Sequence, residues 1–326
     1  MQEISQQRLA RGYAIALSCA AVLSTTAVFI RYLTETYGMP ALVLASWRDA
    51  LAALALLPIL LWKCPAKLRL EQRQLRYLLG YGLVFAGFNA FWTMSVAENG
   101  DAVATVLVYC STAFTALLGR WLLHERLDGV KVLVILLALG GCLLVAGAAD
   151  GTAWRTGWSG IAAGLLSGLG YAGYSLLGRG AATEQRLDPW VTLFYTFSFA
   201  TAFLVLLNAL SGGHLPGTAA GWSSFFWLRD ARAGWGVLAL LAAGPTVLGF
   251  GLYDVSLVYL PSSIVNLVAT SEPVFTAAIS YCLLSERLSR QQLLGSAIIL
   301  AGVVALRLHE GWRAKRFPAQ TVDKAI

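Results

Sequence analysis

Two short stretches of this chain decide its fold. Trp121–Leu127 reads WLLHERL and Cys282–Leu288 reads CLLSERL, and each is followed by an apolar run rich in glycine. The two stretches lie 161 residues apart, and the same spacing pairs Gly141 with Gly302. Self-similarity at a fixed spacing indicates a duplicated structural unit. We therefore expect the chain to consist of two equivalent halves.

The composition predicts a membrane protein. Hydrophobic residues make up 58% of the 326 residues and charged residues only 13%, whereas a soluble domain is about 25% charged. A single globule could not bury so much apolar surface and keep a wetted exterior. This excludes a disordered chain, a nucleic-acid-binding domain and most soluble enzymes. The net charge of +7 does not point to nucleic acid, because the basic residues lie in short tracts between apolar runs.

Hydropathy and helix-breaking residues predict ten transmembrane helices. They run over residues 12–34, 39–62, 75–97, 101–123, 129–147, 158–180, 188–210, 234–258, 261–283 and 290–308. The longest connection carries an aromatic cluster at Trp222–Trp227, which is typical of an amphipathic segment at the membrane interface. The first apolar run is too long for the core of a signal peptide, so we expect it to be retained.

The distribution of charge predicts the orientation. Seventeen of the 24 basic residues fall on the side of both termini and six on the other side, with Arg48 inside a span. The positive-inside rule then places the terminal segments 1–11 and 309–326 in the cytoplasm. The two halves are 12–147 and 158–308.

An odd number of helices in each half has a further consequence. Because each half contains five helices, the second half must be inverted relative to the first. The predicted fold is therefore an all-α membrane protein of ten transmembrane helices arranged as two inverted five-helix repeats. Inverted repeats are typical of secondary transporters, whose site lies near the membrane midplane. A duplicated structural or enzymatic membrane protein is the alternative.

The chain resembles a known family. Two five-helix halves, each ending in Glu-Arg-Leu and a glycine-rich last helix, look like the EamA-type members of the drug/metabolite transporter superfamily. Arg48–Leu51 and Ser271–Phe275 match the same pattern, and the resemblance covers about residues 12–308. It implies export of small metabolites from the cytoplasm, and the chain is most similar to bacterial exporters of aromatic amino acids. The halves differ where Ser111-Thr112 stands in place of Glu272-Pro273.

Polar side chains within the spans are candidates for function, because they are costly in a membrane. Arg48 and Asp49 could meet a substrate carboxylate or ammonium, or pair with a neighbouring helix; as adjacent helical residues they need not pair with each other. Asp254 could bind an ammonium, carry a proton or cap a helix. Asn266 and Thr270 lie one turn apart and could contact substrate or bridge helices.

Aromatic residues in the spans could form a cavity wall that stacks flat side chains. The candidate substrate-binding residues, besides the polar ones above, are Trp47, Asn89, Trp92, Tyr109, Tyr171, Tyr174, Tyr195 and Tyr253. Packing and interfacial positions are the alternative for each aromatic residue, because such residues are common in any membrane bundle.

Pro245, Gly249 and Pro273 are candidate hinges. Proline within a span removes a backbone hydrogen bond and bends the helix, and such positions could let one half rock against the other. A fixed kink is the alternative. Glu125 and Glu286, the glutamates of the two Glu-Arg-Leu triplets, lie at predicted helix ends, where we expect capping and pairing of loops.

Two further patterns predict local packing. Gly160, Gly164 and Gly168 form two overlapping GxxxG steps, which favour close contact between membrane helices. The polar residues at 98–101 predict a tight turn between the third and fourth spans.

No metal, cofactor or catalytic site is predicted. The five cysteines and three histidines lack the spacing of metal ligands. The sequence has no phosphate-binding loop, so we do not expect ATP hydrolysis to supply the energy for transport. Residues 12–34 contain no acid, which excludes proton antiport through the first-helix glutamate that small multidrug members of the superfamily use.

These observations predict a secondary transporter of the bacterial inner membrane. It would export amino acids, with aromatic and other apolar ones favoured, by alternating access. Its partners would be a small-molecule substrate and the lipid bilayer, and a monomer is compatible with this prediction. The alternatives are an exporter of other small metabolites, nucleotide sugars or lipophilic drugs, a channel, and an integral membrane enzyme.

Overall fold

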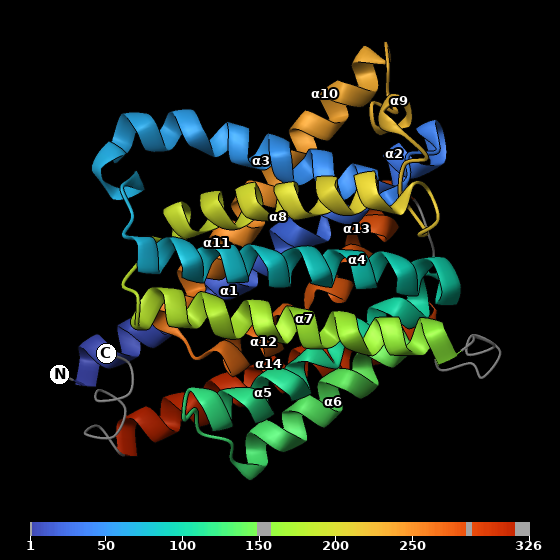
Figure 1. Ribbon diagram of the computed structural model, residues 1–326. Coiled ribbons are helices and arrows are strands. Elements are labelled where there is room, and N and C mark those ends of the chain that lie inside the picture. The colour runs from blue at the N-terminus through green and yellow to red at the C-terminus, as the bar shows by residue number, and fades with distance from the viewer. Residues whose placement is uncertain (1, 149–157, 285–288, 317–326) are drawn as a thin grey trace.

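The computed structural model describes residues 2–148, 158–284 and 289–316, and within these ranges the chain forms helices and no strand (Figure 1). The α-helices are α1 Gln2–Ser24, α2 Thr26–Tyr37, α3 Ala41–Lys63, α4 Gln72–Tyr109, α5 Ser111–Leu122, α6 Gly129–Val145, α7 Trp158–Thr183, α8 Pro189–Ser211, α9 Trp222–Phe225, α10 Arg232–Leu241, α11 Val247–Tyr259, α12 Ser262–Ala269, α13 Glu272–Leu284 and α14 Arg290–Arg316. A 3-10 turn, η1 (Pro65–Leu68), and a π-helix, η3 (Ala242–Thr246), complete the set. The predicted all-α class is confirmed.

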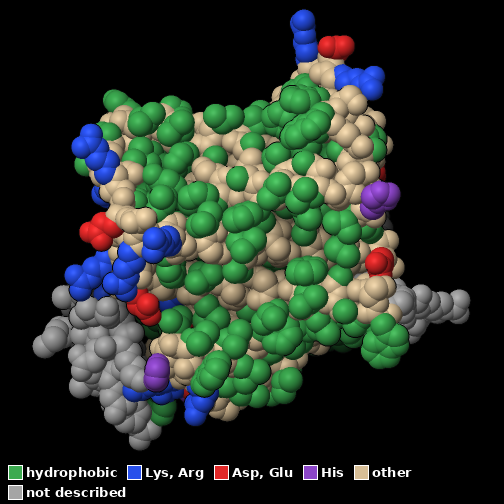
Figure 2. Space-filling model, in the orientation of Figure 1, with side chains coloured by type: hydrophobic (Ala, Val, Ile, Leu, Met, Phe, Trp, Pro, Cys, Tyr) green, Lys and Arg blue, Asp and Glu red, His purple; other side chains and the backbone are tan. Residues whose placement is uncertain are grey.

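The lateral surface of the bundle is apolar. In the described part of the chain, seven helical segments are long and apolar enough to cross a membrane. They are Gln7–Tyr37, Ala41–Lys63, Val103–Leu122, Trp158–Thr183, Pro189–Ser211, Arg232–Tyr259 and Arg290–Arg313. Large side chains such as Leu54, Leu136 and Leu206 are exposed, and Figure 2 shows hydrophobic groups across the face while charged groups gather at the two ends. Such a surface is suited to lipid, so a multi-pass membrane protein is confirmed.

The start of α1 and the end of α14 lie at the same end of the bundle, here called the terminal end (Figure 1). Two connections between helices contact each other there. Lys67 follows α3 and Asp188 precedes α8, and Lys67 Nζ donates to Asp188 Oδ2 at 2.8 Å. The Arg11 guanidinium of α1 lies 5.4 Å from the ring centroid of Tyr259 at the end of α11. The segment 211–231, which includes α9, lies at the other end, here called the opposite end.

Asp128 ties the two last helices of the halves together at the terminal end. It caps α6 by accepting from the Lys131 N–H at 2.9 Å, and its Oδ2 contacts His309 and Arg313 of α14. Partial burial raises the pKa of Asp128, but the Lys131 N–H, His309 and Arg313 outweigh burial, and the net pKa lies below the usual value. A lowered pKa stabilises the folded chain at neutral pH, and this contribution is lost as the pH falls through the carboxylate range.

The chain reverses direction within α4, although helical hydrogen bonding continues to Tyr109. A Cβ atom on Gly164 of α7 would lie 2.7 Å from both Ser95 Oγ and Leu107 Cβ. Twelve residues of straight helix would separate those positions by about 18 Å, so the chain folds back between them. The reversal agrees with the turn predicted at 98–101, and Glu98 accepts a hydrogen bond from the Ser159 hydroxyl at the start of α7.

Two helices are interrupted inside the bundle. Cys110 separates α4 from α5, and Thr270 and Ser271 separate α12 from α13. Cys110 and Ser271 are 161 residues apart, which is the spacing of the internal repeat. Helices α5 and α12 pack together. The two interruptions therefore occupy equivalent positions, although only the second half has a proline there.

The candidate hinge residues lie at three different kinds of position. Pro245 lies inside the π-helix η3, which interrupts the eighth predicted span. Pro273 lies in the first turn of α13, where its missing N–H needs no partner; the expectation of a kink within a continuous ninth span is wrong. Gly249 lets α11 approach α1, because a Cβ there would lie 2.4 Å from Leu23 Cδ2.

Replacing Gly164 tests the helix contact that folds α4 along α7. We expect Gly164→Ala to lower the free energy of unfolding by about 1–3 kcal/mol, because its Cβ would lie 2.4 Å from Leu107 Cδ1. The matched control is Gly140→Ala on α6, where nothing lies within 4 Å. Thermal unfolding of the detergent-purified variants measures the difference; equal midpoints for the two would contradict the packing role.

Candidate functional site

Arg48, Asp49 and Asn89 form a buried polar cluster between α3 and α4. Arg48 Nε and Nη2 donate to Asp49 Oδ1 at 3.1 and 3.0 Å, and Arg48 Nη2 lies 3.4 Å from Asn89 Oδ1. Only 7% of Arg48 and none of Asp49 is exposed. The two neighbours therefore pair with each other. The charge of Arg48 is already compensated in this state.

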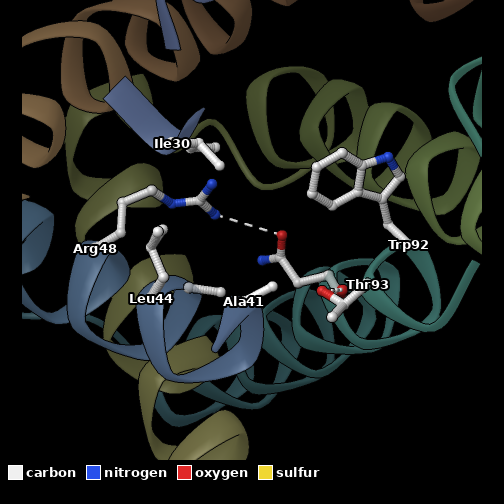
Figure 3. A pocket seen from close by; sticks show the side chains of 8 residues that line it. Ile30, Ala41, Leu44, Arg48, Trp92 and Thr93 are labelled. Atoms are coloured by element: carbon white, nitrogen blue, oxygen red, sulfur yellow. Dashed lines mark hydrogen bonds between the residues drawn. The ribbon is translucent and has the colours of Figure 1, made fainter. Parts of the chain in front are cut away.

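A small cavity lies beside Arg48 (Figure 3). Three helices line it. Helix α2 contributes Ile30; α3 contributes Ala41, Leu44, Ala45 and Arg48; and α4 contributes Asn89, Trp92 and Thr93. Figure 3 shows Arg48 and Trp92 on two sides of the cavity. Its volume of about 20 Å³ is roughly the space of one water molecule. An amino acid does not fit there unless the surrounding helices separate.

Asp254 is the most enclosed acid among the described residues of the second half. It is 3% exposed, and its Oδ1 accepts hydrogen bonds from the hydroxyls of Tyr174 at 3.1 Å and Tyr81 at 3.4 Å. Its Oδ2 has no hydrogen-bond partner among the described residues. Because Tyr81 belongs to the first half and Asp254 to the second, this contact crosses between the halves.

A chain of hydrogen bonds continues from Tyr253, next to Asp254. The Tyr253 and Ser175 hydroxyls lie 2.5 Å apart, and Asn266 Nδ2 donates to Ser175 Oγ at 3.0 Å. The Ser111 hydroxyl donates to Asn266 Oδ1 at 3.1 Å. Helices α11, α7, α12 and α5 are thus joined by one polar layer inside the bundle.

Glu272 reaches the same interrupted region from α13. The Tyr109 hydroxyl donates to Glu272 Oε2 at 3.2 Å, which links the end of α4 to the start of α13. Thr270, at the break itself, is fully buried and donates to the Leu267 carbonyl. The sequence-predicted residues Tyr109, Asn266 and Thr270 therefore lie together.

Aromatic rings cover this polar layer. Eight rings are in contact with one another, with centroids 5.1–6.2 Å apart. They belong to Tyr81, Phe85, Phe88, Tyr171, Tyr174, Phe197, Phe250 and Tyr253. Sequence reasoning named only Tyr171, Tyr174 and Tyr253. A spacing of four and three residues along α4 places Tyr81, Phe85 and Phe88 on one helix face, and this signal could have identified them.

Two predicted residues lie elsewhere. Trp47 packs against Phe225 and Trp235 and donates from Nε1 to the Phe225 carbonyl, so it anchors α9 at the opposite end. The Tyr195 hydroxyl donates to the Leu68 carbonyl at 2.8 Å, so it fixes a loop at the terminal end. The expectation that both share one cavity wall with the other aromatic residues is wrong, because their rings turn away from the centre.

Glu125 closes the terminal end between the halves. Its Oε1 accepts from the Ser262 N–H at 2.7 Å, and its Oε2 accepts from the Ser263 N–H at 3.1 Å. The hydroxyls of both serines also donate to it. The predicted capping role of Glu125 is confirmed, but the helix that it caps is α12 of the other half. Glu286, its counterpart, lies outside the described residues.

The apolar exterior and the enclosed polar layer define a multi-pass membrane protein with a polar site inside its helices. A family model described as the EamA-like transporter family matches residues 10–147 and 158–308. The chain belongs to this family and is a transporter. Within the described residues, no three His, Cys, Asp or Glu side chains are grouped to hold a metal ion.

Curated relatives are similar along most of the chain. An uncharacterized transporter of Archaeoglobus fulgidus is 28% identical, with 89% of this chain and 94% of that protein covered. An uncharacterized transporter of Bacillus subtilis is 24% identical, with 80% and 82% covered. A solved crystal structure shares the fold, with a TM-score of 0.75, 18% identity and 92% of this chain and 97% of that chain covered.

The Arg48–Asp49 pair makes a prediction for stability. Arg48→Met leaves the buried Asp49 carboxylate without its cation, and we expect a loss of about 3–5 kcal/mol in the free energy of unfolding. The double variant Arg48→Met/Asp49→Asn removes both charges and should recover most of that loss. Thermal unfolding of the single and double variants decides; a double variant as unstable as the single one would contradict the pairing.

Proposed function

We propose that this transporter exports amino acids, with aromatic and other apolar ones favoured, from the bacterial cytoplasm by alternating access. The observation that carries the proposal is the enclosed layer where the two interrupted helices meet. It combines eight contacting aromatic rings with the acids Asp254 and Glu272 and the amide of Asn266. Rings can stack on a flat side chain, and the polar groups can orient an amino acid's charged groups.

The topology we propose has ten membrane crossings. The two arms of α4 supply the third crossing and, with α5, the fourth. Helix α6 and the pair α12–α13 supply shorter crossings beside the seven long segments. Domains 12–147 and 158–308 then form two inverted repeats of the bacterial inner membrane. Basic residues at the terminal end support a cytoplasmic location for both termini, 1–11 and 309–326.

The different closure of the two ends supports the proposal of alternating access. At the terminal end, one carboxylate, Glu125, holds two backbone N–H groups and two hydroxyls of the other half. Towards the opposite end, the cavity beside Arg48 already has room for about one water. Loading from the cytoplasm would require Glu125 to release α12. The π-helix at Pro245 and the break before Pro273 are the positions where the second half could bend.

Uptake into proteoliposomes tests the substrate. We expect saturable uptake of labelled phenylalanine and tryptophan above that of empty vesicles. Tyr171→Leu should raise KM for tryptophan by roughly 2–10-fold, because it removes a stacking ring from the centre. Tyr281→Leu, on an exposed position of α13, is the control and should leave KM unchanged. Absence of uptake of phenylalanine, tryptophan and threonine would contradict the amino acid assignment.

Cysteine labelling tests the topology. In a chain whose five native cysteines are replaced, Lys67→Cys should react only from the cytoplasmic side and His214→Cys only from the outside. Lys67 lies in the connection after α3 at the terminal end, and His214 lies in the segment between α8 and α9. A membrane-impermeant thiol reagent, applied to right-side-out and inverted vesicles, makes the measurement. Labelling of both positions from one side would exclude the proposed topology.

A further inference from the structure

Asp254 is a buried acid that has no basic partner in the described part of the chain. Its carboxylate is 3% exposed, and both of its hydrogen bonds come from tyrosine hydroxyls to the same oxygen, Oδ1. The other oxygen, Oδ2, has no partner in the described part of the chain. An unsatisfied buried carboxylate oxygen is costly, and a native structure that retains one usually has a functional reason.

The balance of charge in the layer favours a cation. Arg48 is already paired with Asp49 at 3.0 Å, and Arg179, the other buried arginine of the described residues, donates to the Leu257 carbonyl. Across the described ranges, no Lys, Arg or His lies within ion-pair distance of Asp254 or Glu272. A substrate carboxylate would therefore meet a compensated arginine and two uncompensated acids, whereas a substrate ammonium would meet acids alone.

The surroundings of Asp254 also fit an ammonium group. The ring of Tyr174 contacts those of Tyr81 at 5.1 Å and Tyr253 at 5.6 Å. Aromatic faces attract cations, most strongly where water is excluded. Gly178 of α7 keeps this contact close, because a Cβ there would lie 2.7 Å from the Tyr81 hydroxyl and 3.5 Å from Asp254 Oδ1. The carboxylate and its tyrosine cage are thus built from α4, α7 and α11.

We propose that Asp254 Oδ2 and the rings of Tyr81, Tyr174 and Tyr253 form an ammonium-binding subsite, and that the transporter also takes aromatic monoamines that lack a carboxylate. The inference rests on the proposed function, since it concerns the same central layer. It differs in its substrate class: the amine and the aromatic body are recognised, and the carboxylate of an amino acid is tolerated rather than required.

Three probes that share one aromatic body test the proposal on the full chain in proteoliposomes. They are phenylalanine, phenethylamine, which lacks the carboxylate, and 3-phenylpropionate, which lacks the amine. We expect phenethylamine to inhibit labelled phenylalanine uptake at least as well as unlabelled phenylalanine does, and 3-phenylpropionate to be about tenfold weaker or worse. Saturable uptake of N,N,N-trimethylphenethylammonium, which cannot cross the bilayer as a neutral species, should report transport directly.

The variant Asp254→Asn tests whether phenethylamine binds at the proposed subsite. It preserves size and removes the charge, so the ligand-free variant should unfold at the same temperature as the wild type or higher, while the thermal shift caused by phenethylamine is lost. Glu35→Gln is the control, because it removes a carboxylate from an exposed pair with Arg31 and should keep the full shift. A variant that unfolds earlier but keeps the shift would show that Asp254 is structural and would overturn the proposal.

The outcomes separate this inference from the proposed function. Uptake of phenylalanine without inhibition by phenethylamine would overturn the ammonium subsite and leave amino acid export standing. Equal inhibition by 3-phenylpropionate would also overturn it. If no amino acid is taken up, export of amino acids fails, and the phenethylamine shift of the wild type against Asp254→Asn still decides the subsite. If Asp254→Asn does not fold, the comparison of the three probes on the wild type decides.

Discussion

The structure depends on one constraint: within hydrocarbon, every polar group must find its partner inside the protein. Regular helices satisfy this requirement along the apolar exterior, and on the face that Figure 2 shows the charged groups gather at the two ends. The breaks at Cys110 and Ser271 leave helix ends that lipid could not satisfy. They are tolerated because they lie inside the bundle, where the Thr270 hydroxyl donates to the Leu267 carbonyl and the Ser111 hydroxyl joins α5 to Asn266 of α12. The same enclosure makes this layer the place where a polar substrate can be held.

Close helix packing positions that layer. The glycines of α7 let both arms of α4 approach: Gly164 faces Ser95 and Leu107, and Gly178 faces Tyr81. Without these small residues, the aromatic face of α4 could not reach Tyr174 or the Asp254 carboxylate. Small residues are the common means of bringing membrane helices together, because lipid offers no hydrophobic drive for their association. The site is therefore a consequence of packing between the halves.

Sequence reasoning located the acids, the internal repeat and several site residues, but not their partners. Hydropathy indicated that Asp254 lies in a span, yet not that two tyrosines would share its Oδ1. Trp47 and Tyr195 were expected in the central wall because they are aromatic and lie in spans. They lie outside it, because a helix presents neighbouring residues on different sides and periodicity does not say which side faces the centre. The stripe of Tyr81, Phe85 and Phe88 did carry such information, and it points inward.

The sequence by itself determined the helical class, the membrane location and the duplicated halves, because these follow from composition and spacing along the chain. Only the tertiary structure decided that Arg48 pairs with Asp49, that Glu125 caps a helix of the other half, and that Asp254 is left with an unpartnered oxygen. Glu125 and Ser262 are 137 positions apart, and Tyr81 and Asp254 are 173 apart, whereas Arg48 and Asp49 are neighbours that could each have turned to another partner. They depend on how helices pack and rotate against one another, which hydropathy does not encode.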